Sequence, residues 1–160
     1  VDFLADWGVK GLCISGGGEP TLHKGLPELI RAAAEKMDVC VVTNAVEHYS
    51  DELIEALVKC RWVALSIDAA RPHTYKVIKG KERFRDVIRN VAKLSRARRQ
   101  AGAGVDLCYK YLLLPENQAE IVAACKLAKR LGVQDFHLRP VDFDRADLKG
   151  AQRGPRPTAI

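Results

Sequence analysis

Apolar positions along the chain alternate between two spacings. Five short segments have the length and composition of strands: residues 11–15, 39–43, 62–67, 105–114 and 134–139. Between them, apolar residues recur at i, i+3, i+4 and i+7, as on one face of a helix. Such alternation predicts parallel strands with right-handed crossovers. We therefore expect an α/β fold of about five parallel strands with outer helices, as part of a barrel or as a doubly wound sheet.

Local signals place the ends of the four expected helices. The first covers residues 26–37, and the second follows Ser50, a suitable N-cap. The third carries its apolar face between Phe84 and Leu94, and the fourth covers 118–131 with Gly132 placed to end it. We further expect residues 39–43, a continuous run rich in β-branched residues, to form a strand that is buried on both faces.

Composition indicates one ordinary globular domain. The 160 residues are 48% apolar and 29% charged, and no apolar run approaches the roughly 20 residues that span a bilayer. The start resembles no signal peptide and carries no initiator Met, so we expect a fragment. The cysteines are far apart, the closest two being separated by 17 positions: Cys13, Cys40, Cys60, Cys108 and Cys125. We expect buried free thiols, which suit a reducing, cytoplasmic protein.

The net charge of +6 has two main sources, residues 93–99 and the polar tail with Lys149, Arg153 and Arg156. A basic helix face can meet a phosphate backbone, but it is more often simply solvated. We therefore expect no nucleic-acid partner and no membrane partner.

The end of the first strand carries the most informative motif. Ser15 is followed by three glycines, Glu19, Pro20 and Thr21. Glycines allow positive φ and a close approach of the backbone to a ligand. Glu19 then lies on a turn just beyond the sheet, where its carboxylate can accept hydrogen bonds from an ammonium group. The motif has neither the lysine of a P-loop nor the spacing of a dinucleotide fingerprint.

This motif and the later strand ends resemble those of radical S-adenosylmethionine (SAM) enzymes. Residues 17–20 (GGEP) are similar to the element that binds the amino group of SAM in that family. The same order continues with 43–44 (TN), 66–68 (SID), 113–117 (LLPEN) and 136–140 (FHLRP). The resemblance covers residues 8–141 and implies a partial (β/α)6 barrel.

The resemblance also implies a set of SAM contacts, with the backbone of the last strand beside the adenine. The residues assigned in this way are Gly17, Gly18, Glu19, Pro20, Thr43, Asn44, Ser66, Asp68, Leu138 and Arg139. It does not choose among Lys76, Lys79 and Arg83 for a further cation that contacts SAM. Two positions stay open for the Arg139 side chain: the barrel interior, where it would pair with a carboxylate such as one on the substrate, or the surface, where an arginine before a proline is often found. We expect the His137 side chain to point to the opposite face from Arg139.

In the family, SAM is cleaved reductively at a [4Fe–4S] cluster to a 5′-deoxyadenosyl radical, which abstracts hydrogen from the substrate. The implied partners are SAM, an unidentified substrate and an electron donor such as ferredoxin or flavodoxin. The CxxxCxxC loop that holds the cluster is absent here. We therefore expect residues 1–141 to supply the second to sixth barrel strands of a fragment that is inactive alone. We expect residues 142–160 to be a disordered or truncated tail.

Two alternatives remain open from sequence alone. One is a non-catalytic module on a decayed barrel that binds SAM or, through its basic helix, RNA. The other is an unrelated α/β barrel enzyme with a glycine turn.

Overall fold

A single parallel sheet forms the centre of the computed structural model, which describes residues 1–140. The spatial order of its strands follows the sequence, β1-β2-β3-β4-β5, and every neighbouring pair is parallel. This confirms the predicted α/β fold. The strands are β1 (Gly11–Ile14), β2 (Asp38–Thr43), β3 (Trp62–Ser66), β4 (Asp106–Leu113) and β5 (Asp135–Pro140). The expected tail, 142–160, lies outside the described residues.

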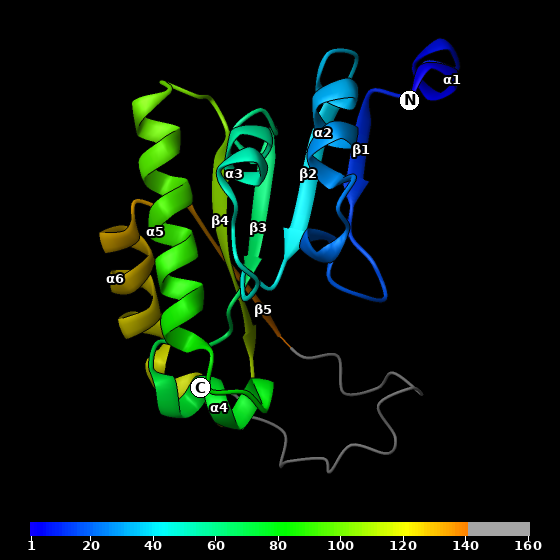
Figure 1. The fold of residues 1–160 in the computed structure, drawn as a ribbon. Helices are drawn as coiled ribbons and strands as arrows, with labels where there is room; N and C mark the ends of the chain where they lie inside the picture. Colours follow the sequence, from blue (N-terminus) through cyan, green and yellow to red (C-terminus); the bar gives the residue numbers. More distant parts are fainter. Residues whose placement is uncertain (141–160) are drawn as a thin grey trace, which may run out of the picture.

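The four predicted helices lie on one face of the sheet (Figure 1). They are α2 (Leu26–Ala34), α3 (Asp51–Leu57), α5 (Phe84–Gln100) and α6 (Ile121–Leu131). Ser50 caps α3 as predicted, because its hydroxyl accepts a hydrogen bond of 3.1 Å from the Leu53 amide. Gly132 ends α6 in the left-handed conformation with φ 73°. Sequential parallel strands with right-handed crossovers place all of these helices on the same side.

Four shorter elements were not among the predicted helices. They are α1 (Asp2–Asp6), the 3-10 turns η1 (Pro20–Leu22) and η2 (Gln118–Glu120), and α4 (Pro72–Lys79). Helix α4 buries only Thr74 and Tyr75, so it lacks the apolar stripe from which a helix is recognised. The sequence marks only the two ends of this helix, with Pro72 in its first turn and Gly80 at its C-terminal end. It lies at the carboxyl ends of the strands (Figure 1).

The core fills the space between the sheet and the helices. Val41, Leu65 and Tyr109 are completely buried and point to the helical face, where Ile30 and Leu94 are also completely buried. Alternate residues point to the other face, which we call the open face, defined by Cys40, Val42, Ser66, Lys110 and His137.

The open face corrects two expectations. Residues 39–43 are buried on one face only, because Cys40 and Val42 are half-buried on a face that no described helix covers. The cysteines are not uniformly buried either: Cys60 and Cys108 are, whereas Cys13 and Cys125 are exposed and Cys40 is intermediate. An apolar run thus marks a strand without showing that both of its faces are covered.

Candidate functional site at the carboxyl rim

Glu19 joins the loop after β1 to the end of β2. Its Oε1 accepts hydrogen bonds from the Thr21 amide (3.1 Å), the Thr21 hydroxyl (2.7 Å) and the Thr43 hydroxyl (2.6 Å). Its Oε2 accepts one bond of 2.7 Å, from the Asn44 amide. The side chain is half-buried and lines a cavity of about 360 Å³ with residues of the glycine loop and α2. The structure thus brings three of the sequence-predicted site residues, Glu19, Thr43 and Asn44, into direct contact.

Thr43 connects this carboxylate to the core. Its hydroxyl proton goes to Glu19, so the Tyr49 hydroxyl at 3.2 Å donates to Thr43. The Thr43 oxygen also accepts from the Ala45 amide at 3.0 Å. Burial raises the pKa of Tyr49 well above its ordinary value, so this phenol stays protonated and remains a donor. Asn44 adds a local turn through its Oδ1, which accepts from the Val46 amide at 2.8 Å.

The glycines before Glu19 act by leaving space and not by unusual dihedral angles. Among residues 1–140, the glycines with positive φ are Gly8, Gly80, Gly102 and Gly132, so the 16–18 loop does not use the positive φ that its glycines allow. A Cβ atom added at Gly17 or Gly18 would have no neighbour within 4 Å. The backbone there is exposed, with room for a ligand to approach. Pro20 begins the η1 turn that follows.

Asp68 forms a second polar centre, two residues beyond β3. It is 5% exposed and has positive φ, 60°, which an aspartate tolerates better than most residues. Its Oδ1 accepts from the Leu112 amide at 2.6 Å, and its Oδ2 forms an ion pair with Lys79. Ser66 lies at the edge of this pair, with its Oγ 3.5 Å from both Asp68 Oδ2 and Lys79 Nζ. Ser66 and Asp68 therefore share one centre, separate from Glu19.

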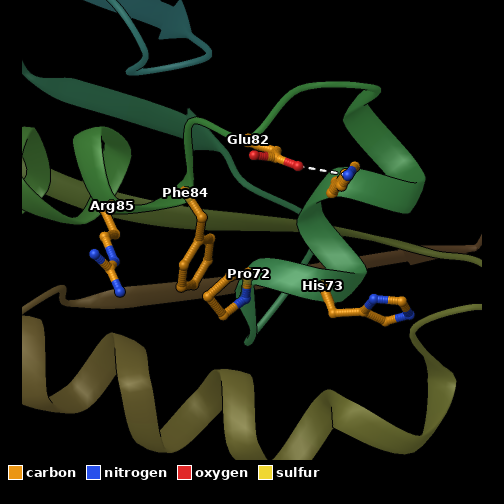
Figure 2. A pocket seen from close by; sticks show the side chains of 6 residues that line it. Pro72, His73, Glu82, Phe84 and Arg85 are labelled. Atoms are coloured by element: carbon orange, nitrogen blue, oxygen red, sulfur yellow. Dashed lines mark hydrogen bonds and ion pairs between the residues drawn. The ribbon is translucent and has the colours of Figure 1, made fainter.

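The three cations that sequence could not distinguish have different partners. Lys79 reaches Asp68 at the strand end. Lys76 pairs with Glu82 in a surface pocket that Pro72, His73, Phe84 and Arg85 also line, as the dashed line in Figure 2 marks. Arg83 binds Asp86 and the Val46 carbonyl. Only Lys79 lies beside Ser66.

Two residues to which sequence reasoning assigned no role hold these strand ends together. The completely buried Asn117 amide donates to the carbonyls of Asp68 and Leu112, both at 2.8 Å. Glu120, 8% exposed, accepts from the Ala70 amide at 3.0 Å and the Thr74 hydroxyl at 2.6 Å. Their partners lie 46 to 50 residues away except for Leu112, so no local pattern signals these contacts.

Strand β5 presents His137 and Arg139 to one cavity. Both residues line a space of about 200 Å³ together with Ser66, Asp68 and Lys110. The expectation that His137 faces away from Arg139 is wrong, because residues two apart in a strand share a face. Leu138, between them, alternates to the helical face and is 42% exposed. Within residues 1–140, no three His, Cys, Asp or Glu side chains are grouped to hold a metal ion.

Comparison with known proteins gives the same family as the strand ends. The family model described as "Radical SAM superfamily" matches residues 1–135. The chain is 33% identical over 99 residues to GTP 3′,8-cyclase of Chlorobaculum tepidum, covering 59% of this chain and 29% of that protein. It is 35% identical over 79 residues to the S-adenosylmethionine-dependent nucleotide dehydratase of Flammeovirga pacifica, covering 49% of this chain and 27% of that protein.

The fold matches a solved structure as well. SuiB of Streptococcus suis superimposes with a TM-score of 0.68 at 19% identity, over 86% of this chain and 31% of SuiB. The chain therefore spans under a third of the length of each of these three proteins. None of the helices in residues 1–140 is both long and apolar enough to cross a membrane.

Proposed function

Since this chain belongs to the radical SAM superfamily, we propose that it is part of an enzyme that cleaves SAM reductively through a [4Fe–4S] cluster. The chemistry that SAM supplies there is a 5′-deoxyadenosyl radical, which takes a hydrogen atom from the substrate. The residues of this chain would hold and orient SAM at the carboxyl rim of the sheet. Ligands gather at that rim in parallel α/β folds.

The proposal rests on one observation: the two oxygens of the Glu19 carboxylate accept different numbers of hydrogen bonds. An ionised carboxylate offers about four acceptor positions. Oε1 takes three donors, whereas Oε2 takes only the Asn44 amide. Oε2 therefore has room for a further donor. The three internal bonds to Oε1 fix the orientation of the carboxylate, so an arriving ammonium group meets an acceptor that needs no reordering.

The other proposed SAM contacts come from residues at the same carboxyl ends of the strands. We propose that the glycine loop from Gly17 to Pro20 lies along the methionine part of SAM, beside Thr43 and Asn44. Ser66 would donate to SAM, with Asp68 and Lys79 fixing its position. The backbone at Leu138 and Arg139 would lie beside the adenine.

The cysteines of this chain do not fit a [4Fe–4S] cluster. None of the 160 residues forms a CxxxCxxC loop, and the closest two cysteines, Cys108 and Cys125, are 17 positions apart. We therefore propose that the cluster ligands lie outside these residues, and that the 160 residues alone do not cleave SAM. The electron donor would be a ferredoxin or flavodoxin, in the cytoplasm.

The basic helix gives little support to an RNA-binding function. Lys93 Nζ donates to the Tyr49 carbonyl and pairs with Asp51, both at 2.8 Å. Arg98 donates to the Val105 carbonyl at 2.6 Å. These cations therefore have partners within the fold.

Equilibrium binding of SAM to the 160-residue chain tests the proposal. Charge-assisted hydrogen bonds contribute about 1.5–3 kcal/mol, so we expect Glu19→Gln to weaken SAM binding by about ten- to a hundredfold. Glu28→Gln, which removes an exposed charge in α2, should leave the affinity unchanged.

A second variant separates binding from turn stability. Thr21→Ala removes the 2.7 Å hydroxyl bond to Glu19 but leaves the carboxylate in place. It should lower the urea midpoint of unfolding while SAM binding stays within a few-fold of wild type. If Glu19→Gln lowers the midpoint but binds SAM like wild type, Glu19 only stabilises the turn and the proposal fails.

A further inference from the structure

Two cysteines lie on neighbouring strands at the β1 edge of the sheet. Cys13 in β1 is the register partner of Cys40 in β2, and the two strands run side by side (Figure 1). The residues before and after each cysteine belong to the core or pack against it on the helical side: Leu12, Ile14, Val39 and Val41. Since side chains alternate along a strand, both cysteine side chains point to the open face. Their thiols are therefore neighbours on one surface.

The pair can be reached from solvent and is separate from the proposed SAM contacts. Cys13 is exposed and Cys40 is half-buried. Burial raises the pKa of Cys40, and the neighbouring Cys13 thiol is the second cause of that rise. Cys13 lies three positions before Gly16 and Cys40 three positions before Thr43, which is about 10 Å along an extended chain. The two thiols therefore lie away from the carboxyl rim.

The spacing of the strands decides which kind of bridge suits the two sulfur atoms. Side chains stand roughly perpendicular to a sheet, so the two Cβ atoms keep about the 4.8 Å spacing of adjacent strands. A disulfide draws its Cβ atoms to about 3.8 Å, so a direct sulfur–sulfur bond would strain the strands here. Two metal–thiolate bonds of about 2.3 Å in line span about 4.6 Å, which matches the strand spacing. A metal ion between the sulfur atoms therefore fits without displacing a strand.

We propose that Cys13 and Cys40 form a two-coordinate site for a soft monovalent metal ion, Cu(I). Thiolates are among the ligands that select Cu(I) over hard cations. Structural zinc sites need four ligands, and the described part of the chain groups no three His, Cys, Asp or Glu side chains for a metal ion. Cu(I) keeps its oxidation state on binding, because two S–Cu bonds form while two thiol protons leave to solvent.

Anaerobic titration of the reduced 160-residue chain with Cu(I), in competition with bathocuproine disulfonate, tests the site. We expect one tight site per chain. Because the second thiolate binds intramolecularly, its loss should weaken binding by at least about a hundredfold in Cys13→Ser and in Cys40→Ser. Cys125→Ser removes an exposed thiol on α6 and is the matched control, which should leave the affinity unchanged. Zn²⁺ should bind much more weakly than Cu(I), because two thiolates fill only half of its coordination shell.

Alkylation of the thiols gives an independent measurement within the same molecule. Bound Cu(I) should slow the reaction of Cys13 with iodoacetamide by at least about tenfold, because the thiolate that reacts is then bound to the metal. Cys125 should react at its metal-free rate and serves as the internal control. X-ray absorption of the bound Cu(I) should show two sulfur neighbours and no third ligand.

Several results would overturn the two-thiolate site. Absence of tight Cu(I) binding, equal loss of affinity in Cys125→Ser, or wild-type affinity in Cys13→Ser would each do so. A third ligand on Cu(I), or Zn²⁺ binding as tight as that of Cu(I), would also contradict it. Cys13 is exposed, so Cys13→Ser should keep the wild-type urea midpoint and decides the matter even if Cys40→Ser unfolds. SAM affinity should be the same in Cys13→Ser as in wild type, because the pair lies outside the proposed SAM contacts.

Discussion

At the scale of single residues, burial decides the chemistry of the five thiols. Desolvation raises the pKa of Cys60 to about 12 and that of Cys108 to about 11. It also raises the pKa of Cys40, with the neighbouring Cys13 as a smaller cause. Cys125 is exposed on α6. Because the thiolate is the reactive form, burial acts twice, by blocking access and by keeping the thiol protonated.

We therefore predict selective alkylation by iodoacetamide at pH 8. Cys125 and Cys13 should react first, and Cys60 and Cys108 at least about a hundredfold more slowly, since a pKa of 11 to 12 leaves little thiolate. Peptide mass spectrometry over time gives the rates, and all five thiols should react in 8 M urea as the positive control. Equal rates for Cys60 and Cys125 in the folded protein would contradict the described burial.

Local motifs pointed to part of the candidate site. Glu19 was recognisable because its glycine and proline neighbours lie next to it in sequence. Its bond to Thr43 joins residues 24 positions apart, and Asn117 reaches Asp68 across 49. Such contacts depend on which strands become neighbours, so a local motif can suggest the acceptor without giving its partners.

At the scale of elements, two helices end at a glycine with positive φ, and the two glycines have different neighbours. Gly80 ends α4 with φ 68° and Gly132 ends α6 with φ 73°. A Cβ at Gly80 would have no neighbour within 4 Å, whereas one at Gly132 would lie 2.7 Å from both Ser95 Oγ and Arg99 Nη1. The sequence predicted the end of α6 because an amphipathic helix precedes Gly132. It did not predict α4, whose buried residues are too few to form a periodic stripe.

This difference predicts an order of stabilities. Gly80→Ala should cost about 1–2 kcal/mol, the strain of a left-handed alanine. Gly132→Ala should cost more, because the side chains of Ser95 and Arg99 must also move away and their 2.7 Å hydrogen bond is disturbed. Gly104→Ala, which has neither positive φ nor a close neighbour, is the control and should cost little. Urea unfolding gives the three values, and equal costs for Gly80→Ala and Gly132→Ala would contradict the contacts described.

At the scale of the whole molecule, the helices of residues 1–140 cover one face of the sheet and leave the other face open. Hydrophobic periodicity predicted the five parallel strands and the four main helices, but it left the strand order open between a barrel and a doubly wound sheet. It did not predict the open face, since half-buried residues such as Cys40 and Val42 are as apolar as core residues. The covered face concentrates groups that folding keeps neutral, including Cys60 and Tyr111, whose pKa values burial raises to about 12.

Alkaline pH should therefore destabilise the fold. A pKa that is higher in the folded than in the unfolded state means that the folded protein retains its proton where the unfolded chain has lost it. Stability is then full below the unfolded pKa, about 8.5 for Cys and 10 for Tyr, and falls as pH rises towards the folded values. Urea midpoints should decrease from pH 8.5 to pH 11, and less steeply in Cys60→Ala. A midpoint that is constant or rises over this range would contradict the prediction.

In the proposed function, the Glu19 carboxylate binds the ammonium group of SAM at the carboxyl rim. The most direct measurement is the distance between Glu19 Oε2 and the SAM amino nitrogen in a crystal structure of the complex. We predict a hydrogen bond of about 2.7–3.2 Å, with Oε1 still bound by Thr21 and Thr43. A complex in which the amino nitrogen binds elsewhere, while the Glu19 carboxylate keeps only its internal partners, would contradict the account.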